Sequence, residues 1–167
     1  MISEKLEKEL NLQVNREIES AYIYQAMAAY ANELDLPGAV NFFEVQAEEE
    51  LFHAKKMMHF IMDRGGRAEI TGFETPRKDY SSLLDVLENA LIHERKVTGW
   101  INDIMDIAIS EKDHAARSFL NWYVDEQVEE EAQFEELIAK VKKLDVVGLY
   151  LIDQEMAART FTPPQQA

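Results

Sequence analysis

The stretch GGRAEITGFETPRKDY, residues 65–80, decides the fold that the sequence predicts. It separates two long segments with helical periodicity, and a connection of this length is unusual inside a compact domain. Fully extended it reaches about 50 Å, whereas the helix expected before it is about 40 Å long. The stretch can therefore run the whole length of a helix bundle, so that the helices on either side of it lie parallel.

Apolar residues recur every three or four positions in four long segments, as expected for amphipathic helices. These helices are expected to begin at Ser3, at Pro37, just after Ser82 and near Asp113. The first is expected to end at Asn32 and the second before the glycine pair at 65–66. The short connections within the first and the second pair of helices make each pair antiparallel.

A short apolar segment, residues 145–158, follows the fourth helix and is expected to form a fifth helix. Residues 159–167 end in TPPQQA and are expected to be a flexible tail. The sequence thus predicts one domain, residues 1–158, of the all-α class. Its architecture is an up-down four-helix bundle with one long crossover between helices two and three, which is ferritin-like topology.

The composition excludes several classes of protein. A formal net charge of −15 repels nucleic acid and anionic lipid and attracts cations. The chain has no cysteine, which excludes disulfides, thiolate zinc sites, iron–sulfur clusters and cysteine nucleophiles. It has no apolar run of the ~18–20 residues that span a bilayer, and its first residues, MISEK, lack a signal-peptide pattern. We expect a cytoplasmic protein that binds neither nucleic acid nor a membrane.

Each of the four apolar stripes is interrupted near its middle by polar residues. The interruptions are Glu17, Glu50 with His53, Glu94, and Gln127 with Glu130. Helices of similar length share their midpoints, so these side chains are expected to meet at one level inside the bundle. One such glutamate usually reaches solvent or has an ion-pair partner, but four central interruptions favour a metal site. Carboxylates that converge in an apolar interior repel one another, and one or two divalent cations remove that repulsion.

The spacing of these residues indicates which metal they suit. Glu50 and His53 form a Glu-x-x-His motif, which places both side chains on one helical face. Carboxylates with one imidazole suit Fe(II), Mn(II) or Zn(II). In di-iron bundles two helices give one Glu each and two give Glu-x-x-His. Here Gln127 stands for the Glu of the fourth helix and Glu130 for its His, so the second metal position is expected to have fewer and weaker ligands.

Two further features leave alternatives open. Glu49, Glu126 and Glu129 lie on adjoining faces of the second and fourth helices. Glu49 and Glu129 belong to runs of three glutamates, residues 48–50 and 129–131, and Glu126 lies one turn before the second run. Their spacing is equally typical of a third, looser metal site and of a solvated charged face. Tyr24 shares its stripe with Glu17, and it can hydrogen-bond a ligand, pass an electron or simply pack in the core.

At these residues the sequence resembles the bacterial non-haem ferritins, over nearly the whole chain from residue 4 to about residue 156. The matching stretches are 46–53 (QAEEELFH), 119–124 (FLNWYV) running into Glu126, Gln127 and 129–131 (EEE), and 148–153 (GLYLID). The ligand sets that the resemblance implies are Glu17, Glu50 and His53 for the first iron, Glu50, Glu94 and Glu130 with Gln127 close by for the second, and Glu49, Glu126, Glu129 and Glu130 for a third site. Tyr24 matches the tyrosine of the family beside the centre.

The resemblance also implies an activity and an assembly. Members of the family oxidise Fe(II) with dioxygen or peroxide and store the product as a ferric mineral inside cages of 24 subunits. We therefore expect a ferroxidase that binds iron, with Glu17, Glu50, His53, Glu94, Gln127 and Tyr24 as its catalytic residues. The fifth helix would pack around the fourfold axes of a homo-oligomeric cage. No haem is expected, because Leu51 stands where the related bacterioferritins have a haem-ligating Met.

Two other functions stay open from the residues alone. One is a di-iron or manganese oxygenase or oxidase that acts on an organic substrate, which would need an apolar pocket beside the metals. The other is a non-catalytic bundle in which the same carboxylates hold zinc or calcium permanently.

Overall fold

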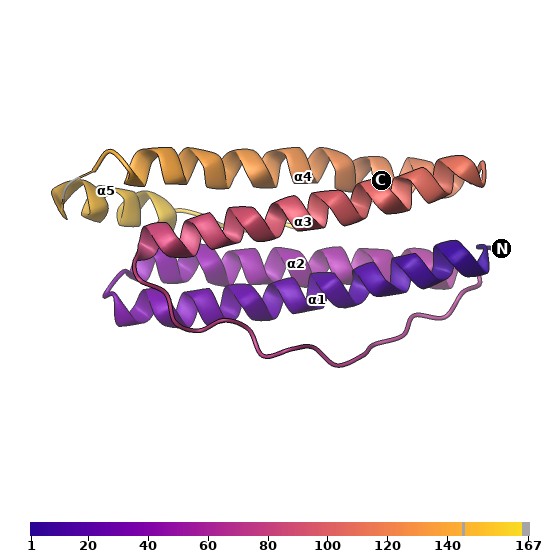
Figure 1. The fold of residues 1–167 in the computed structure, drawn as a ribbon, viewed down its shortest axis with the longest axis horizontal. Helices are drawn as coiled ribbons and strands as arrows, with labels where there is room; N and C mark the ends of the chain where they lie inside the picture. The colour runs from indigo at the N-terminus through magenta and orange to yellow at the C-terminus, as the bar shows by residue number, and fades with distance from the viewer. Residues whose placement is uncertain (145, 165–167) are drawn as a thin grey trace.

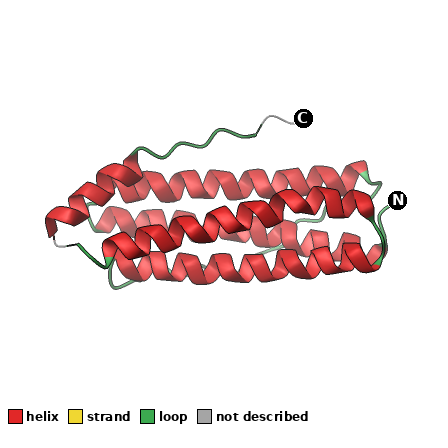
Figure 2. Ribbon diagram, turned by 90° about the horizontal axis from the view of Figure 1, so that it is seen from above, coloured by secondary structure: helices red, strands yellow, loops and turns green. Residues whose placement is uncertain are grey.

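The structure is a computed structural model that describes residues 1–144 and 146–164. Its helices are α1 (Glu4–Glu33), α2 (Pro37–Asp63), α3 (Leu83–Ser110), α4 (His114–Val141) and α5 (Val146–Ala157). The first four lie side by side along one long axis, and α5 lies at one end of this bundle (Figure 1; Figure 2). The described ranges contain no strand. The expected four-helix bundle with a short fifth helix is therefore confirmed.

Local capping sets where three of the helices begin. The hydroxyls of Ser3 and Ser82 and the carboxylate of Asp113 each accept a hydrogen bond from the backbone amide three residues further on, at 3.1, 3.1 and 2.9 Å. These side chains satisfy donors that the first turn of a helix leaves unpaired. The expected starting points are therefore correct, and α1 and α2 end within about one residue of their expected ends.

The start of α2 depends on α5, because the N-cap residue of α2 is a leucine without a capping side chain. Asp153 of α5 takes over this role, and its Oδ1 accepts a hydrogen bond from Ala39 N at 2.8 Å. Gly38 makes the close approach feasible, since a Cβ there would lie 1.7 Å from the Asp153 carbonyl oxygen. The Asn41 side chain donates to carbonyl oxygens at the end of α5, including that of Arg159 at 3.0 Å. The fifth helix is thus fixed to the first turns of α2.

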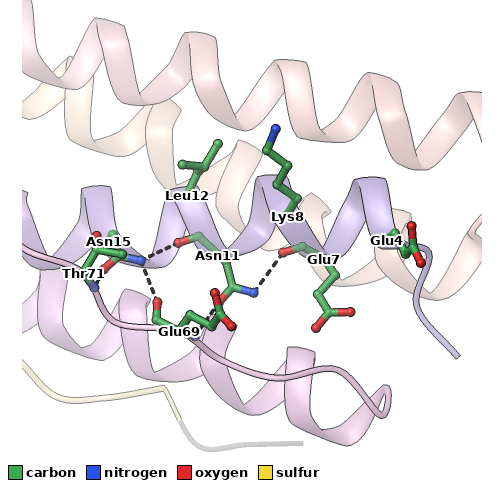
Figure 3. A pocket seen from close by; sticks show the side chains of 8 residues that line it. All are labelled: Glu4, Glu7, Lys8, Asn11, Leu12, Asn15, Glu69 and Thr71. Carbon is green, nitrogen blue, oxygen red and sulfur yellow. Dashed lines mark hydrogen bonds between the residues drawn. The ribbon is translucent and has the colours of Figure 1, made fainter.

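The long crossover runs along the bundle beside α1 (Figure 1). Asn11 and Asn15 of α1 fix its path through four hydrogen bonds, and those with residues 69 and 71 can be followed in Figure 3. Their side-chain amides donate to the carbonyl oxygens of residues 67 and 69 at 2.9 and 2.8 Å. Their side-chain oxygens accept from the amides of residues 69 and 71 at 2.7 Å each. The two asparagines therefore bind alternate backbone groups of an extended segment, as a neighbouring strand would.

The core consists of two apolar clusters with a polar layer between them. The cluster nearer α5 contains Tyr24, Phe43 and Phe134, and the other contains Leu10 and Leu120. On each of the four long helices the buried polar positions fall between these clusters or at their edges. The side chains of the polar layer are Gln13, Glu17, Ser20, Gln46, Glu50, His53, Glu94, Gln127 and Glu130. The expected meeting of the central residues at one level is therefore observed.

Over the part of the chain that the structure describes, no helix combines the length and the apolar character needed to cross a bilayer. The predicted boundary at residue 158 falls one residue beyond the end of α5. Arg159 and Phe161, just after it, contact Glu49 and Phe52 of α2. Residue 145, where the fifth segment was expected to begin, and residues 165–167 of the expected tail lie outside the described residues. The division into domain and tail stays a prediction.

Candidate metal centre

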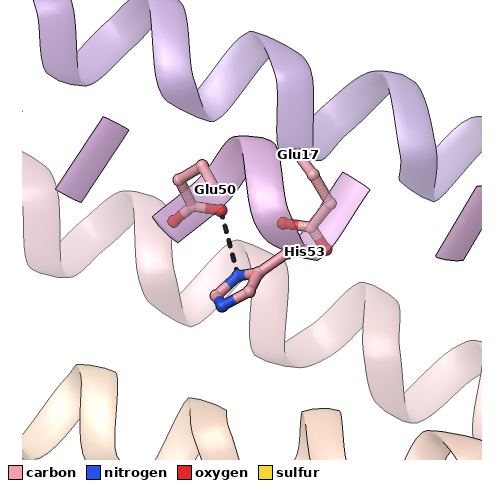
Figure 4. A group of neighbouring side chains, drawn as sticks. All are labelled: Glu17, Glu50 and His53. Atoms are coloured by element: carbon pink, nitrogen blue, oxygen red, sulfur yellow. Dashed lines mark ion pairs between the residues drawn. The ribbon is translucent and has the colours of Figure 1, made fainter. Parts of the chain in front are cut away.

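Three side chains of ligand type meet in the α1–α2 half of the polar layer (Figure 4). One oxygen of Glu17, one oxygen of Glu50 and one ring nitrogen of His53 lie within 4.8 Å of one another. The Nδ1 atom of His53 is 3.4 Å from Glu50 Oε2. All three residues are at most 3% exposed. The Glu-x-x-His spacing on α2 and the central position of Glu17 on α1 therefore bring together the residues expected at the first iron position.

Two carboxylate oxygens in this half accept no hydrogen bond. Glu17 Oε1 accepts a hydrogen bond from Gln13 Nε2 at 2.9 Å, but Glu17 Oε2 and Glu50 Oε2 are buried without any hydrogen-bond partner. Burying a carboxylate oxygen in this way is destabilising unless a proton or a cation compensates it. Carboxylate oxygens with one imidazole are a donor set that Fe(II) accepts. The residues in this half therefore fit a divalent iron ion.

The α3–α4 half of the layer is arranged differently. Glu94 Oε1 accepts a hydrogen bond from the Tyr24 hydroxyl, and Glu94 Oε2 accepts one from Gln127 Nε2 at 3.1 Å. Glu130 Oε2 accepts a hydrogen bond from Gln46 Nε2 at 2.6 Å. Within the described ranges, Glu94 and Glu130 do not join a group of ligand atoms as close as the one in the other half. These two carboxylates are held by hydrogen bonds from neutral side chains, and they do not converge on a common point as Glu17 and Glu50 do.

Burial changes the acidity of all four carboxyl groups. It raises the pKa of Glu17 and of Glu50 well above the ordinary value, and neighbouring glutamates add to both rises. Burial also raises the pKa of Glu94 to about 7 and that of Glu130 to about 8. Hydrogen bonds from Tyr24 and Gln127 oppose the rise at Glu94. The metal-free centre therefore retains protons near neutral pH, and a bound cation displaces them.

The second acidic group is less compact than the centre. Glu49 and Glu126 are half-buried and Glu129 is exposed. These three do not form a ligand group of the kind found at Glu17, at least among the described residues. Glu49 Oε2 instead accepts a hydrogen bond from Nη2 of Arg159. The structure thus places a cation of the protein itself at the edge of the site that the resemblance implies.

Sequence reasoning missed two glutamines of the polar layer, although a signal was present. Gln13 precedes Glu17 by four residues and Gln46 precedes Glu50 by four, and each pair shares a helical face. Both glutamines are fully buried, and both donate to a carboxylate of the centre. The repeated Gln-x-x-x-Glu pattern could have identified them.

A pocket of about 420 Å³ between α3 and α4 reaches the centre at Gln127. Thr98, Val124 and Val128 line it, together with acidic residues such as Glu131. A second pocket, of about 360 Å³ between α1 and the crossover, contains none of the expected ligands (Figure 3). The pocket between α3 and α4 therefore lies next to Gln127, and its lining does not include the carboxylates or the histidine of the centre.

A four-helix bundle with one long crossover and a carboxylate–imidazole group at its middle defines the class of di-iron carboxylate proteins. A family model described as a ferritin-like domain matches residues 7–144. The bacterial non-heme ferritin of Staphylococcus aureus (strain USA300) is 43% identical over 163 residues, which cover 96% of this chain and 98% of that protein. The chain belongs to the ferritin family.

Solved structures agree with this assignment. An engineered closed form of the Archaeoglobus fulgidus ferritin superposes with a TM-score of 0.95 at 42% identity, over 97% of this chain and 100% of that one. The open pore ferritin of the same archaeon gives a TM-score of 0.94 at 41% identity, over 96% and 100%. The resemblance read from the sequence is thus confirmed, and family membership supports its expected function, iron storage with ferroxidase activity.

Proposed function

We propose that this chain oxidises Fe(II) to Fe(III) at the centre inside each subunit, with dioxygen or hydrogen peroxide as the oxidant. The ferric product is stored as a mineral inside a cage of 24 copies. The observation that carries the proposal is the buried group of Glu17, Glu50 and His53, with two carboxylate oxygens that accept no hydrogen bond, in a bundle of the ferritin family. Iron is the substrate and the cargo of this reaction.

The residues of the centre have different roles in this proposal. Glu17 and His53 hold the first iron, and Glu50 lies between the two positions. Glu94 and Glu130 hold the second iron, with Gln127 as a weaker neutral neighbour. Carboxylate oxygens suit both oxidation states of iron, and their charge offsets that of the ferric product.

The second position needs a rearrangement before iron can occupy it. Glu94 is engaged by Tyr24 and Gln127, and Glu130 is engaged by Gln46. A cation that binds there replaces these neutral donors as partner of the carboxylates. In the metal-free centre Tyr24 contacts Glu94, which supports its proposed place beside the reaction.

Four further expectations belong to this proposal. Leu51 is half exposed on α2, and it offers no ligand for a haem. The apolar side chains of Val147, Tyr150 and Leu151 on α5 are 63–70% exposed in the single chain, which supports burial against other subunits of a homo-oligomer. We also propose that the protein is cytoplasmic and that residues 1–158 form the iron-binding domain ahead of a flexible tail.

The lining of the pocket beside Gln127 favours storage over the oxygenase alternative. The pocket beside the centre carries Glu131 and Glu135 along with its apolar residues. Such a lining suits a hydrated cation better than an apolar organic substrate. A permanent zinc or calcium bundle differs from both, because it would consume no oxygen when Fe(II) is added.

The proposal is tested by adding a large excess of Fe(II) to the metal-free protein in air while oxygen consumption is recorded. Size exclusion then separates the protein, and the iron in the protein peak is counted. A large particle that holds far more than two or three ions per chain is the expected result. A small species that retains only two or three ions would contradict storage. Unchanged oxygen would exclude dioxygen as the oxidant, and a lack of Fe(III) formation with added hydrogen peroxide as well would contradict oxidation.

A further inference from the structure

Arg159, just beyond the end of α5, brings a positive charge to the second acidic group. Its Nη2 donates to Glu49 Oε2, and the two side chains are each 14% exposed. Burial raises the pKa of Glu126 and of Glu130, and the guanidinium charge of Arg159 opposes both rises. The field of this one cation therefore reaches carboxylates on both α2 and α4.

Contacts on three sides hold Arg159 in this place. Its guanidinium carbon lies 4.5 Å from the centre of the Phe42 ring, an arrangement typical of a cation–π contact. Its backbone carbonyl oxygen accepts a hydrogen bond from Asn41 Nδ2 at 3.0 Å. Two residues further on, the ring of Phe161 lies 5.6 Å from that of Phe52. The position of the guanidinium is therefore a consequence of how α5 is fixed to α2.

One nitrogen of the Arg159 guanidinium lacks a hydrogen-bond acceptor. Nη1 of Arg159 is buried and has no hydrogen-bond partner in the described structure. A buried charged donor without an acceptor destabilises the arrangement that contains it. The ion pair with Glu49 is therefore one that a stronger competitor for the carboxylate can displace.

We propose that Arg159 is an internal counter-cation of the third metal site and that it sets the affinity of this site. It neutralises Glu49 while the site is free of metal. A divalent cation that binds to Glu49, Glu126 and Glu129 must displace the guanidinium. The inference rests on the proposed function and adds to it the third site that the resemblance implies.

Thermodynamic linkage makes the proposal reciprocal. If Arg159 weakens the binding of a cation, then the bound cation weakens the hold of Glu49 on Arg159 by the same factor. Removing the charge of Arg159 should therefore tighten the third site, and filling the third site should loosen the segment around Arg159. The first iron position, at Glu17, Glu50 and His53, should keep its affinity within about twofold, because Arg159 makes no direct contact with these side chains in the described structure. The second position should change less than the third, because Arg159 acts on its ligand Glu130 only through its charge.

The test uses Zn²⁺, which binds carboxylate and imidazole ligands and has no redox chemistry. Zn²⁺ is titrated calorimetrically into the metal-free assembled protein, as the wild type and as Arg159→Gln and Arg159→Lys. Arg77→Gln is the matched control, because Arg77 also pairs with a carboxylate, Asp85 at 2.8 Å, and lies 4.4 Å from an aromatic ring, Tyr80. Deuterium exchange of the amides of residues 158–162 is followed without and with saturating Zn²⁺.

We expect the weakest class of Zn²⁺ sites to tighten about fivefold or more in Arg159→Gln, a size typical of coupled sites. Arg159→Lys, which keeps the charge, and Arg77→Gln should stay near the wild type. Exchange at residues 158–162 should be faster in the Zn²⁺-saturated wild type.

Unchanged or weaker binding in Arg159→Gln would overturn the inference, and so would equal tightening in Arg77→Gln. Two tight sites without any third class in all variants would overturn it while leaving the centre intact. If the wild type itself binds no Zn²⁺ at two tight sites, the result would instead contradict the proposed function.

Discussion

The two halves of the polar layer contain nearly the same residue types but are organised in opposite ways. In the α1–α2 half, Glu17, Glu50 and His53 face a common point, and two carboxylate oxygens accept no hydrogen bond. In the α3–α4 half, Glu94 and Glu130 are held by hydrogen bonds from neutral side chains. One half is ready to accept a cation, whereas the other must first release its own partners.

This difference shows how a bundle can contain four buried glutamates before any metal arrives. The neutral donors stabilise two of the carboxylates, so that fewer of the buried charges remain uncompensated at the same time. The free-energy cost of burying carboxylates is therefore largest in the α1–α2 half, where a bound metal ion would stabilise the protein most. Ordered filling, with the first position before the second, follows from this asymmetry.

The largest expected effect is a loss of stability of the metal-free protein as the pH rises. Burial raises the pKa of Glu94 to about 7 and of Glu130 to about 8, above the unfolded value near 4.5. A raised pKa gives stability that is fully present below pH 4.5 and is lost as the pH rises through the folded value. We expect the metal-free protein to lose at least about 3 kcal/mol per chain between pH 5 and pH 8.

Thermal unfolding between pH 5 and pH 8, with and without Zn²⁺, measures this effect. Glu130→Gln removes one of the titrating groups and should flatten the profile, whereas Glu48→Gln on the exposed face of α2 should not. A metal-free profile that rises toward pH 8 would show that the buried carboxyls do not hold protons in the folded state.

The next effect is on the half that is ready for metal. Glu17→Gln and His53→Ala each remove a ligand of the first position while the apolar clusters on either side stay intact. We expect the initial rate of Fe(II) oxidation to fall by at least about 100-fold in each. Stopped-flow absorbance measures the rate, size exclusion checks the assembly, and Glu44→Gln on the exposed face of α2 is the control. Wild-type rates in both variants would remove these residues from the reaction.

A smaller effect is expected from making the two halves more alike. Gln127→Glu replaces a neutral amide by a carboxylate next to Glu94, and so it adds an anionic ligand to the second position. We expect the second Zn²⁺ to bind roughly 30-fold more tightly, with the first affected much less. Calorimetric titration measures both affinities. An unchanged second affinity would mean that Gln127 is not the cause of the inequality.

The smallest expected effect comes from Gln13 and Gln46, the two glutamines that donate hydrogen bonds to carboxylates of the centre. Gln13→Leu removes the donor to Glu17, and Gln46→Leu removes the donor to Glu130. Gln13→Leu should weaken the first position by about 10-fold, because the amide of Gln13 holds Glu17 in place. Gln46→Leu should tighten the second position by a similar factor, because Glu130 then has no donor to release before a cation binds. Each variant should leave the other position close to the wild type. The same titration distinguishes them, and an equal effect of both variants on both positions would contradict independent halves.

The helices and the level of the centre were predictable because their causes are local. Capping residues such as Ser3 and Ser82 act within three residues, and the interruptions at Glu17 and Glu50 follow the helical period. The length of the connection at residues 65–80 was enough to predict its path, since a short link could not have spanned the bundle.

The remaining features depend on contacts between distant parts of the chain. The donors to Glu94 and Glu130 come from helices α1, α2 and α4, and no spacing within one helix indicates which donor meets which carboxylate. The ion pair of Arg159 with Glu49 joins residues 110 positions apart, and it forms because α5 is fixed to α2. For the same reason, sequence spacing could not distinguish a third metal site from a charged face.

The cap that Asp153 places on α2 also has a consequence for how the chain is made. Ala39 and Asp153 are 114 residues apart, and synthesis at ~5–20 residues per second separates them by roughly 10 s. During that time the first turn of α2 has emerged without its cap, and the Cβ-free surface of Gly38 has nothing to cover it. Helix α5 therefore completes α2, so the first turn of α2 reaches its finished form only after residue 153 has been translated.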